Sequence, residues 1–254
     1  MCVFPIVSTY LCSLNGKGVQ TDFGISSTDL FMGKLIIVPT PIGNLEDFTF
    51  RAVRILKEAD IVLAEDTRVT RKLFSHYGIH APLKAFHQHN EHQFALQLAL
   101  ELTGEKIFAL VSDAGTPGIS DPAYLLVKAC LEQGVEVECL PGATAFVPAL
   151  VKSGLPSTSF CFEGFLPQKK GRATKLKALA DEARTMVFYE SPYRIIKTIE
   201  QFIAAFGVER KASVSRELTK IYEETVNGSL AEILEYYKNH IIKGEFVIVV
   251  AGKN

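Results

Sequence analysis

The stretch KIFALVSDAGTPGISDPA, residues 106–123, carries the clearest structural pattern in the chain. Its apolar run 107–111 predicts a buried strand that ends just before Asp113. After a loop rich in glycine and proline comes Asp121, a good N-cap, and then Pro122, a residue favoured at the first helical position, so a helix is predicted to start there. A strand, a carboxylate, a glycine-rich turn and a capped helix are typical of ligand crevices in open α/β sheets. An ordinary strand-to-helix connection is the alternative.

Two more predicted strand ends carry glycine and proline. PTPIGNL, residues 39–45, follows the first strand, and PGATA, residues 141–145, follows the fifth. Because the carboxyl ends of parallel strands lie at one edge of a sheet, we expect these loops and the loop after residue 111 to converge on one crevice. Their small residues would leave room for a ligand, and helix N-termini would present free N–H groups. Three unrelated tight turns are the alternative.

From residue 34 onward, short apolar runs alternate with helical patterns. Strands are predicted over 35–38, 60–64, 83–87, 107–112, 136–140, 159–163, 186–190, 211–216, 223–227 and 245–251. Helices are predicted over 49–58, 67–77, 91–102, 122–133, 143–152, 172–182, 192–205 and 229–239. The alternation predicts an α/β protein with a mainly parallel sheet in an N-terminal domain, 32–152. A linker at 153–157 leads to a second α/β domain, 158–254, with a mixed sheet of more antiparallel character.

Residues 1–31 differ from the rest, with one basic residue, Lys17, and no clear periodicity. The apolar start lacks a basic n-region and carries Pro5, which argues against a signal peptide. Met32 leads directly into the first predicted strand. We therefore expect the functional protein to start near Met32 and residues 1–31 to be disordered or a misassigned extension, with a genuine N-terminal arm as the alternative.

Composition narrows the class of protein. The chain has 254 residues, 48% hydrophobic and 22% charged, which suits one large or two modest globular domains. With a net charge of −1, contact with a polyanion needs a local basic patch. The five cysteines are odd in number and lack a C-x-x-C spacing, which predicts buried free thiols in a reducing cytoplasm. No apolar run approaches the roughly 18 residues of a membrane span, and the Rossmann, P-loop and G-x-S-x-G fingerprints are missing.

A local basic patch does occur in PQKKGRATKLK, residues 167–177. No acidic residue lies between Glu163 and Asp181, so the stretch suits contacts with phosphates. A solvated helix face is the alternative. The residues predicted to contact such phosphates are Arg68, Lys169, Lys170, Arg172, Lys175 and Arg194, and the resemblance described next implies that the phosphates belong to RNA. Phe165, Tyr189 and Tyr193 are candidates for stacking on bases and equally for the core.

Five segments, in this order, carry a family resemblance: TPIGNLEDFTFRA, EDTRVTRKLF, SDAGTPGISDPA, LPGATA and FYESPYR. Together, from about residue 35 to residue 252, they resemble the S-adenosylmethionine (SAM)-dependent tetrapyrrole methylase family. EDTR and YESPYR make the chain similar to the branch that 2′-O-methylates a cytidine of 16S rRNA near the decoding site of the small ribosomal subunit. The resemblance implies two α/β domains with SAM in the cleft between them, and a cytoplasmic homodimer.

The resemblance also implies which residues hold the cofactor. They are Pro41, Gly43, Asp113, Ala114, Gly115, Ile119, Ser120, Asp121, Pro141, Gly142 and Thr144. Relatives have Gly-Asp-Pro where this chain has Ser-Asp-Ala at 112–114, so only Asp113 matches directly. Backbone groups and a carboxylate suit the polar rim of the adenosine and the amino-acid end of SAM, and a small apolar wall suits the adenine.

In the implied reaction, a ribose 2′ oxygen displaces the sulfonium methyl group. Alignment of the reacting atoms is the main requirement, and a base near the hydroxyl assists. The candidate catalytic residues are Glu65 and Asp66 first, then Glu190, then His87. For Glu65 and Asp66 the alternative is an acidic helix N-terminus.

Three histidines within six residues, His87, His89 and His92, raise the question of a metal site. They lack a carboxylate or cysteine at a recognisable ligand spacing, and the implied chemistry needs no metal. We therefore expect no metal here, but a polar loop that faces RNA or the other domain.

Two other functions stay open. One is methyl transfer to a carbon of a tetrapyrrole precursor, and the other is a non-enzymatic module that binds SAM or RNA. The basic stretch, EDTR and YESPYR favour the RNA methyltransferase over the macrocycle enzyme, although carboxylated macrocycles are anionic too. A measurement of turnover separates the enzyme from the binding module.

Overall fold

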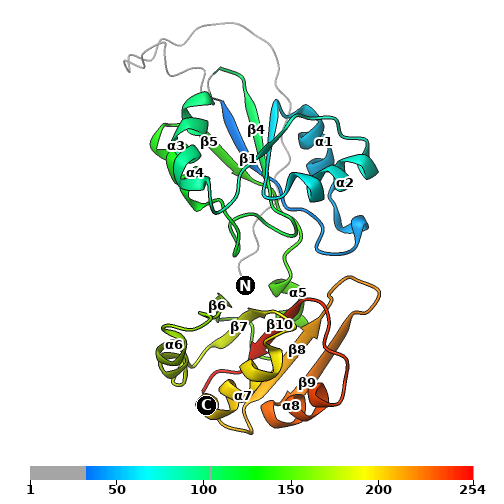
Figure 1. Cartoon of the computed structure of the whole chain (residues 1–254), viewed down its shortest axis with the longest axis vertical. Helices are drawn as coiled ribbons and strands as arrows, with labels where there is room; N and C mark the ends of the chain where they lie inside the picture. The colour runs from blue at the N-terminus through cyan, green and yellow to red at the C-terminus, as the bar shows by residue number, and fades with distance from the viewer. Residues whose placement is uncertain (1–32, 103, 254) are drawn as a thin grey trace, which may run out of the picture. The chain divides into compact units, whose positions relative to one another are not determined.

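The computed structural model describes residues 33–102 and 104–253. The expectations for residues 1–31, including Cys2 and Cys12, lie outside these ranges. The described part contains two five-stranded sheets that follow one another along the chain (Figure 1). The α/β class predicted from the sequence is confirmed, whereas the exact domain boundaries stay a prediction.

The first sheet is parallel, with strand order β3-β2-β4-β1-β5. Its strands are β1 (Lys34–Ile37), β2 (Ile61–Ala64), β3 (Leu83–Ala85), β4 (Ile107–Val111) and β5 (Glu136–Cys139). Its helices are the 3₁₀ turn η1 (Leu45–Asp47), α1 (Phe50–Glu58), α2 (Thr67–Tyr77), α3 (Glu91–Glu101) and α4 (Tyr124–Glu132).

Helices cover both faces of this sheet, α1 and α2 on one and α3 and α4 on the other (Figure 1). Leu35 of β1 packs with Leu98 and Leu126 of α3 and α4. The next residue, Ile36, packs with Leu56 of α1 on the opposite face. A continuous apolar run therefore forms a strand that is buried on both sides.

The second sheet is mixed, with order β6-β7-β10-β8-β9, and only the β6–β7 pair is parallel. Its strands are β6 (Phe160–Phe165), β7 (Thr185–Glu190), β8 (Lys211–Arg216), β9 (Glu224–Ser229) and β10 (Phe246–Val250). Its helices are α5 (Phe146–Lys152), α6 (Arg172–Leu179), α7 (Ile195–Phe206) and α8 (Leu230–Lys238). The predicted antiparallel character of this half is confirmed.

Helix α5 packs against the second sheet, although the sequence-based division assigned residues 143–152 to the first domain. Its Ala149 and Leu150 share an apolar cluster with Val187 of β7 and Val247 of β10. Helices α6, α7 and α8 cover the other face of the sheet. A short helix has no local signal for the sheet it joins, because that choice depends on apolar partners distant in sequence.

Three predicted helix starts, those of α4, α5 and α7, are two or three residues too early, and the start of α4 changes the role of a candidate residue. Helix α4 begins at Tyr124, and Ala123 at its N-cap position makes no side-chain capping bond. The loop continues past Asp121, and Ser120 within it adopts a left-handed conformation, with φ of 71°. Asp121 therefore does not cap α4, and its side chain lines a pocket instead.

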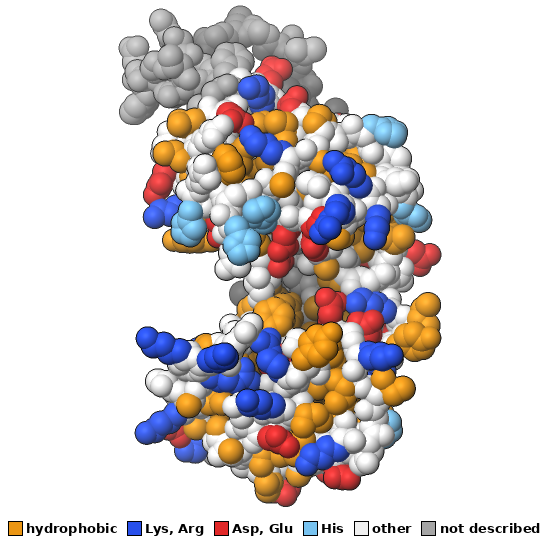
Figure 2. All heavy atoms as spheres, viewed as in Figure 1, with side chains coloured by type: hydrophobic (Ala, Val, Ile, Leu, Met, Phe, Trp, Pro, Cys, Tyr) orange, Lys and Arg blue, Asp and Glu red, His pale blue; other side chains and the backbone are white. Residues whose placement is uncertain are grey.

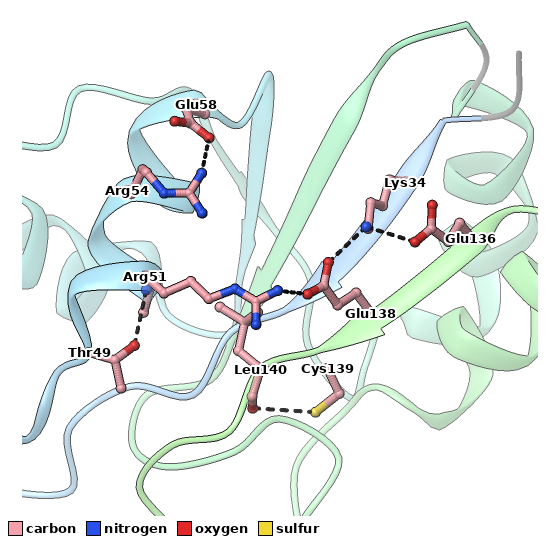
Figure 3. Close-up of polar contacts among 10 residues, drawn as sticks. Lys34, Thr49, Arg51, Arg54, Glu58, Glu136, Glu138, Cys139 and Leu140 are labelled. Carbon is pink, nitrogen blue, oxygen red and sulfur yellow. Dashed lines mark hydrogen bonds and ion pairs between the residues drawn. The ribbon is translucent and has the colours of Figure 1, made fainter. Parts of the chain in front are cut away.

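Ion pairs link β5, an edge strand of the first sheet, to the neighbouring strand β1 and to helix α1 (Figure 3). Lys34 of β1 contacts Glu136 at 2.7 Å and Glu138 at 2.8 Å, and Arg51 of α1 also pairs with Glu138. Charged side chains along an exposed edge discourage pairing with the strand of another molecule. The contacts also tie α1 to the strand whose end forms one wall of the candidate site.

Two predictions from composition, on membrane spans and on cysteines, can be compared with the structure. Among the described residues, no helix is both long and apolar enough to cross a membrane. Cys130, Cys139 and Cys161 are free thiols, as predicted. Only Cys130 is buried, whereas Cys139 is exposed and Cys161 is partly exposed, so the predicted burial holds for one of these three.

Candidate active site

A pocket of about 400 Å³ lies where loops after the first-sheet strands meet residues of the second sheet. Strands β4, β1 and β5 are parallel neighbours, so the loops that follow them emerge at one edge. All three loops contribute to the pocket, as predicted. The lining residues are Ile42, Glu65, Asp113, Ala114, Gly115, Thr116, Ile119, Ser120, Asp121, Thr144, Ala145, Phe165, Tyr189, Glu190, Ser191, Pro192, Leu218, Glu245, Phe246 and Val247.

Hydrogen bonds join the three loops into one unit. Thr40 and Gly115 exchange two backbone bonds, with N···O distances of 2.9 and 3.0 Å. The Thr116 hydroxyl donates to the Ala143 carbonyl at 3.0 Å and so links the second loop to the third. Because the loops hold one another, the pocket wall is organised before a ligand arrives.

Two glycines are required by this close packing. Gly115 has φ of +86°, a conformation that disfavours side chains, and a Cβ there would lie 3.4 Å from Ile42. At Gly142, a Cβ would lie only 2.5 Å from the Cβ of Pro39. Gly115 lets the loop after β4 pack against the loop after β1, and Gly142 does the same for the loop after β5.

Seven of the eleven predicted cofactor residues line the pocket: Asp113, Ala114, Gly115, Ile119, Ser120, Asp121 and Thr144. Pro41 and Gly43 instead line a neighbouring pocket, which shares Asp113 and Ala114 with the first. Pro141 and Gly142 are not among the lining residues of either pocket. Contact of all eleven with a cofactor stays a prediction, and the geometry supports the loop after β4 most directly.

Three carboxyl groups of the pocket perturb one another. Burial, reinforced by the charge of Glu65 and opposed by a hydrogen bond from Ser112, raises the pKa of Asp121 to about 7. Burial and the charge of Asp113 raise the pKa of Glu65. Burial also raises the pKa of Asp113, against a hydrogen bond from the Asp66 backbone N–H. A cationic ligand would relieve this repulsion.

Asp66 performs the structural role that was the alternative for the EDTR segment. Its carboxylate caps α2 by accepting from the Arg68 N–H at 2.8 Å, and it pairs with the Arg68 guanidinium at 2.6 Å. These hydrogen bonds from Arg68 lower the pKa of Asp66 to about 2. Asp66 is not among the residues that line the pocket, so its carboxylate is poorly placed to act as a base.

Glu190 lies at the pocket wall, but its carboxylate is already saturated with donors. It accepts from the Ser191 N–H and the Arg194 Nε, both at 2.8 Å, and from the Thr198 hydroxyl at 2.7 Å. Arg172 Nη2 lies 3.6 Å from its other oxygen. A buried, paired carboxylate of this kind supports the wall, and its oxygens are already engaged by donors from the protein.

Arg172 is buried, at 7% exposure, so the predicted contact with RNA does not fit the structure. Its guanidinium donates to the Pro167 carbonyl and to the Gln201 and Thr198 side chains. Nothing in the local sequence separates Arg172 from the lysines around it, because its burial depends on partners on α7, distant in sequence.

The other predicted RNA contacts are accessible. Lys169 and Lys170 are exposed and form no ion pair within the described part of the chain. Lys175 pairs with Glu163 at 2.6 Å, Arg194 with Glu190, and Arg68 with Asp66. In Figure 2, Lys and Arg side chains gather over the part of the second half where Figure 1 labels α6.

His87, the last candidate base, is not among the pocket-lining residues. Its Nδ1 atom is buried without a hydrogen-bond partner among the described residues, and its ring lies edge-on to His89 at 5.9 Å. Within the described ranges, no group of three or more His, Cys, Asp or Glu side chains is placed to hold a metal ion.

Sequence reasoning missed much of the wall contributed by the second sheet. Leu218, Glu245, Phe246 and Val247 lie in apolar or charged runs without a glycine or proline motif of the kind used above. The aromatic candidates are now distinguished by their exposure. Phe165 lines the pocket and is 52% exposed, Tyr189 lines it half-buried, and Tyr193 is 95% exposed.

Comparisons with known proteins agree with this architecture. Residues 34–234 match the family model described as tetrapyrrole (corrin/porphyrin) methylases. A protein of Escherichia coli O157:H7 named ribosomal RNA small subunit methyltransferase I is 48% identical over 229 residues, which cover 89% of this chain and 80% of that protein. One of the same name from Thermotoga maritima is 44% identical over 222 residues, 87% of this chain and 100% of that protein.

A solved structure shares the fold at low sequence identity. It is uroporphyrin-III C-methyltransferase from Thermus thermophilus complexed with S-adenosylhomocysteine, with a TM-score of 0.58 and 22% identity. The match covers 87% of this chain and 97% of that one.

Proposed function

Because this chain belongs to the tetrapyrrole (corrin/porphyrin) methylase family, we propose that it is a SAM-dependent methyltransferase that acts on small-subunit ribosomal RNA. The observation that carries the proposal is the pocket, in which three mutually repelling carboxyl groups line the converging strand-end loops. The names of relatives at 44–48% identity support the choice of RNA as substrate.

The charge and size of the pocket suit SAM. The cofactor carries a sulfonium and an ammonium group, and Glu65, Asp113 and Asp121 offer negative charge to both. The volume of about 400 Å³ lies in the range of small-molecule sites. Ala114, Ile119 and Thr144 line the pocket and would form the wall for the adenine, and a structural relative is complexed with S-adenosylhomocysteine, the product of methyl transfer from SAM.

Glu65 is the candidate base that best fits the geometry. It lines the pocket and its pKa is raised, whereas Asp66 and Glu190 are engaged in caps and ion pairs. In the proposed reaction the ribose 2′ oxygen bonds to the methyl carbon as the carbon–sulfur bond breaks. The hydroxyl proton passes to Glu65, and S-adenosylhomocysteine leaves. Positioning contributes most of the acceleration.

The target that we propose is the 2′ oxygen of a cytidine of 16S rRNA near the decoding site, reached in the cytoplasm by a homodimer. Lys169 and Lys170 are free to contact phosphates. Arg68, Lys175 and Arg194 would have to exchange a carboxylate for a phosphate.

The experiment is methyl transfer from labelled SAM to small subunits that lack modifications, followed by mass mapping of the RNA. We expect label on a ribose oxygen near the decoding site. Label on a uroporphyrinogen or corrin precursor instead of RNA would assign the chain to macrocycle methylation. Binding of SAM without any transfer would favour the non-enzymatic module.

The role of Glu65 is tested by Glu65→Gln at saturating SAM. We expect kcat to fall by roughly 10²- to 10⁴-fold, the usual contribution of a general base. Glu209→Gln is a matched control, because Glu209 is exposed and forms no ion pair within the described part of the chain. An unchanged kcat for Glu65→Gln would exclude this residue as the base.

A further inference from the structure

Two segments of the pocket wall turn outward to the same rim. One runs from Phe165, at the end of β6, to the exposed Lys169 and Lys170. The other runs from Pro192, which lines the pocket after β7, to the exposed Tyr193. Strands β6 and β7 are parallel neighbours, so both segments leave the sheet at one edge.

The buried Arg172 holds these two segments together. It donates to the Pro167 carbonyl of the first segment at 3.3 Å and to the Thr198 hydroxyl of α7 at 2.6 Å. Thr198 in turn donates to Glu190, which also accepts from Arg194, the residue after Tyr193. The lysines and Tyr193 are therefore mounted on one rigid support beside the pocket.

Tyr193 has no packing role that explains its position. Its side chain is 95% exposed and makes no hydrogen bond or aromatic contact within the described ranges. An exposed aromatic ring beside free cations and next to a pocket is the arrangement that proteins use to bind unpaired nucleotides. Bases stack on the ring while cations track the phosphates.

We propose that Tyr193 stacks on an unpaired nucleobase adjacent to the target nucleotide, while Lys169 and Lys170 contact the flanking phosphates. This inference rests on the proposed function and specifies its substrate as single-stranded RNA. In a duplex, each base is stacked between its neighbours and offers no free face to Tyr193. A splayed single strand offers both a base and the ribose hydroxyl.

The absence of tryptophan from the chain allows a direct test. Tyr193→Trp places a single fluorescent indole at the proposed stacking position. Tyr222→Trp is the matched control, because Tyr222 is 72% exposed and precedes β9, which β10 and β8 separate from β7. The probes are a short single-stranded oligoribonucleotide and the same sequence in a duplex, with binding followed independently by anisotropy.

We expect the single strand to quench the indole at position 193 but not the indole at position 222, and the duplex to quench neither. Tyr193→Ala should weaken single-strand binding about tenfold and leave SAM affinity unchanged. Lys169→Glu with Lys170→Glu should weaken binding and flatten its salt dependence.

Equal quenching at both positions, or binding without quenching at position 193, would overturn the stacking proposal. An unchanged affinity of Tyr193→Ala would also overturn it. Methyl transfer by the wild type separates a failure of the proposed stacking from a failure of the proposed function. If the wild type methylates RNA while Tyr193→Ala behaves identically, only the recognition mode is wrong, whereas no transfer to RNA rejects the proposed function itself.

Discussion

At the scale of single residues, Asp121 shows how position changes chemistry. Its sequence context, just before a proline, predicts a helix N-cap, and the structure places it three residues before α4, at the pocket wall. There, burial and the charge of Glu65 raise its pKa to about 7. A residue expected to stabilise a helix thus becomes a group that titrates near neutral pH.

This pKa makes SAM binding depend on pH. Below about pH 7 the Asp121 carboxyl of the free protein is largely protonated, and above it the carboxylate attracts the cationic cofactor. Affinity for SAM should therefore rise as pH increases through 7 and then level off, with protons released on binding below that point. Calorimetry in buffers of different ionisation enthalpy measures both effects.

Asp121→Asn is the control for this pH dependence. It should bind SAM more weakly at pH 8 and lose most of the variation between pH 6 and 8, because its side chain does not titrate. If the variant kept the wild-type pH profile, the titrating group would be another residue, with Glu65 and Asp113 the next to test.

At the scale of elements, the contact between α6 and α7 depends on polar atoms in an otherwise apolar cluster. Arg172, at the start of α6, bridges Gln201 and Thr198 of α7 and lies near the buried Glu190. Leu176 and Ile199 pack in the surrounding core. Removal of one partner from a buried charge network leaves the other charge uncompensated, which costs more than the loss of an exposed ion pair.

Arg172→Met should therefore lower the free energy of unfolding by about 3 kcal/mol. Lys169→Met, three residues away but exposed, should change it by less than about 0.5 kcal/mol. Urea denaturation of both variants measures the difference. A loss below about 1 kcal/mol for Arg172→Met would mean that water replaces the guanidinium and that the network is not structural.

At the scale of the whole molecule, one pocket draws its wall from both sheets. Asp113 follows β4 of the first sheet, and Val247 lies on β10 of the second. Contacts outside the pocket also join the two parts, including a hydrogen bond from the Asn44 N–H to the Thr219 hydroxyl at 3.1 Å. A ligand in this pocket contacts both parts and stabilises them together.

SAM should accordingly raise the thermal midpoint of a single unfolding transition. At a concentration of about 100 times its Kd, a ligand adds about 2.7 kcal/mol to the free energy of unfolding. Asp113→Ala should lose most of this shift at the same SAM concentration, because a pocket carboxylate is removed. Calorimetric scans with and without SAM provide the measurement. Two transitions, of which SAM shifts only one, would place the ligand on one sheet alone.

Much of this architecture follows from local patterns in the chain. The apolar run at β1 predicts a strand buried on both faces, and alternate residues of that strand do reach opposite clusters. Strand-end glycines and prolines predict the converging loops, because parallel topology brings the carboxyl ends of strands to one edge. Both inferences need only neighbouring residues and general rules of sheet geometry.

The roles of particular side chains required the folded structure. Asp121 lines a pocket instead of capping α4, Arg172 is buried instead of facing solvent, and α5 packs on the second sheet. Each outcome depends on partners distant in sequence: Glu65 beside Asp121, Thr198 beside Arg172, and Val247 beside α5. Periodicity and turn chemistry act between neighbours and are readable from the chain, whereas desolvation and charge coupling arise only when distant segments are brought together.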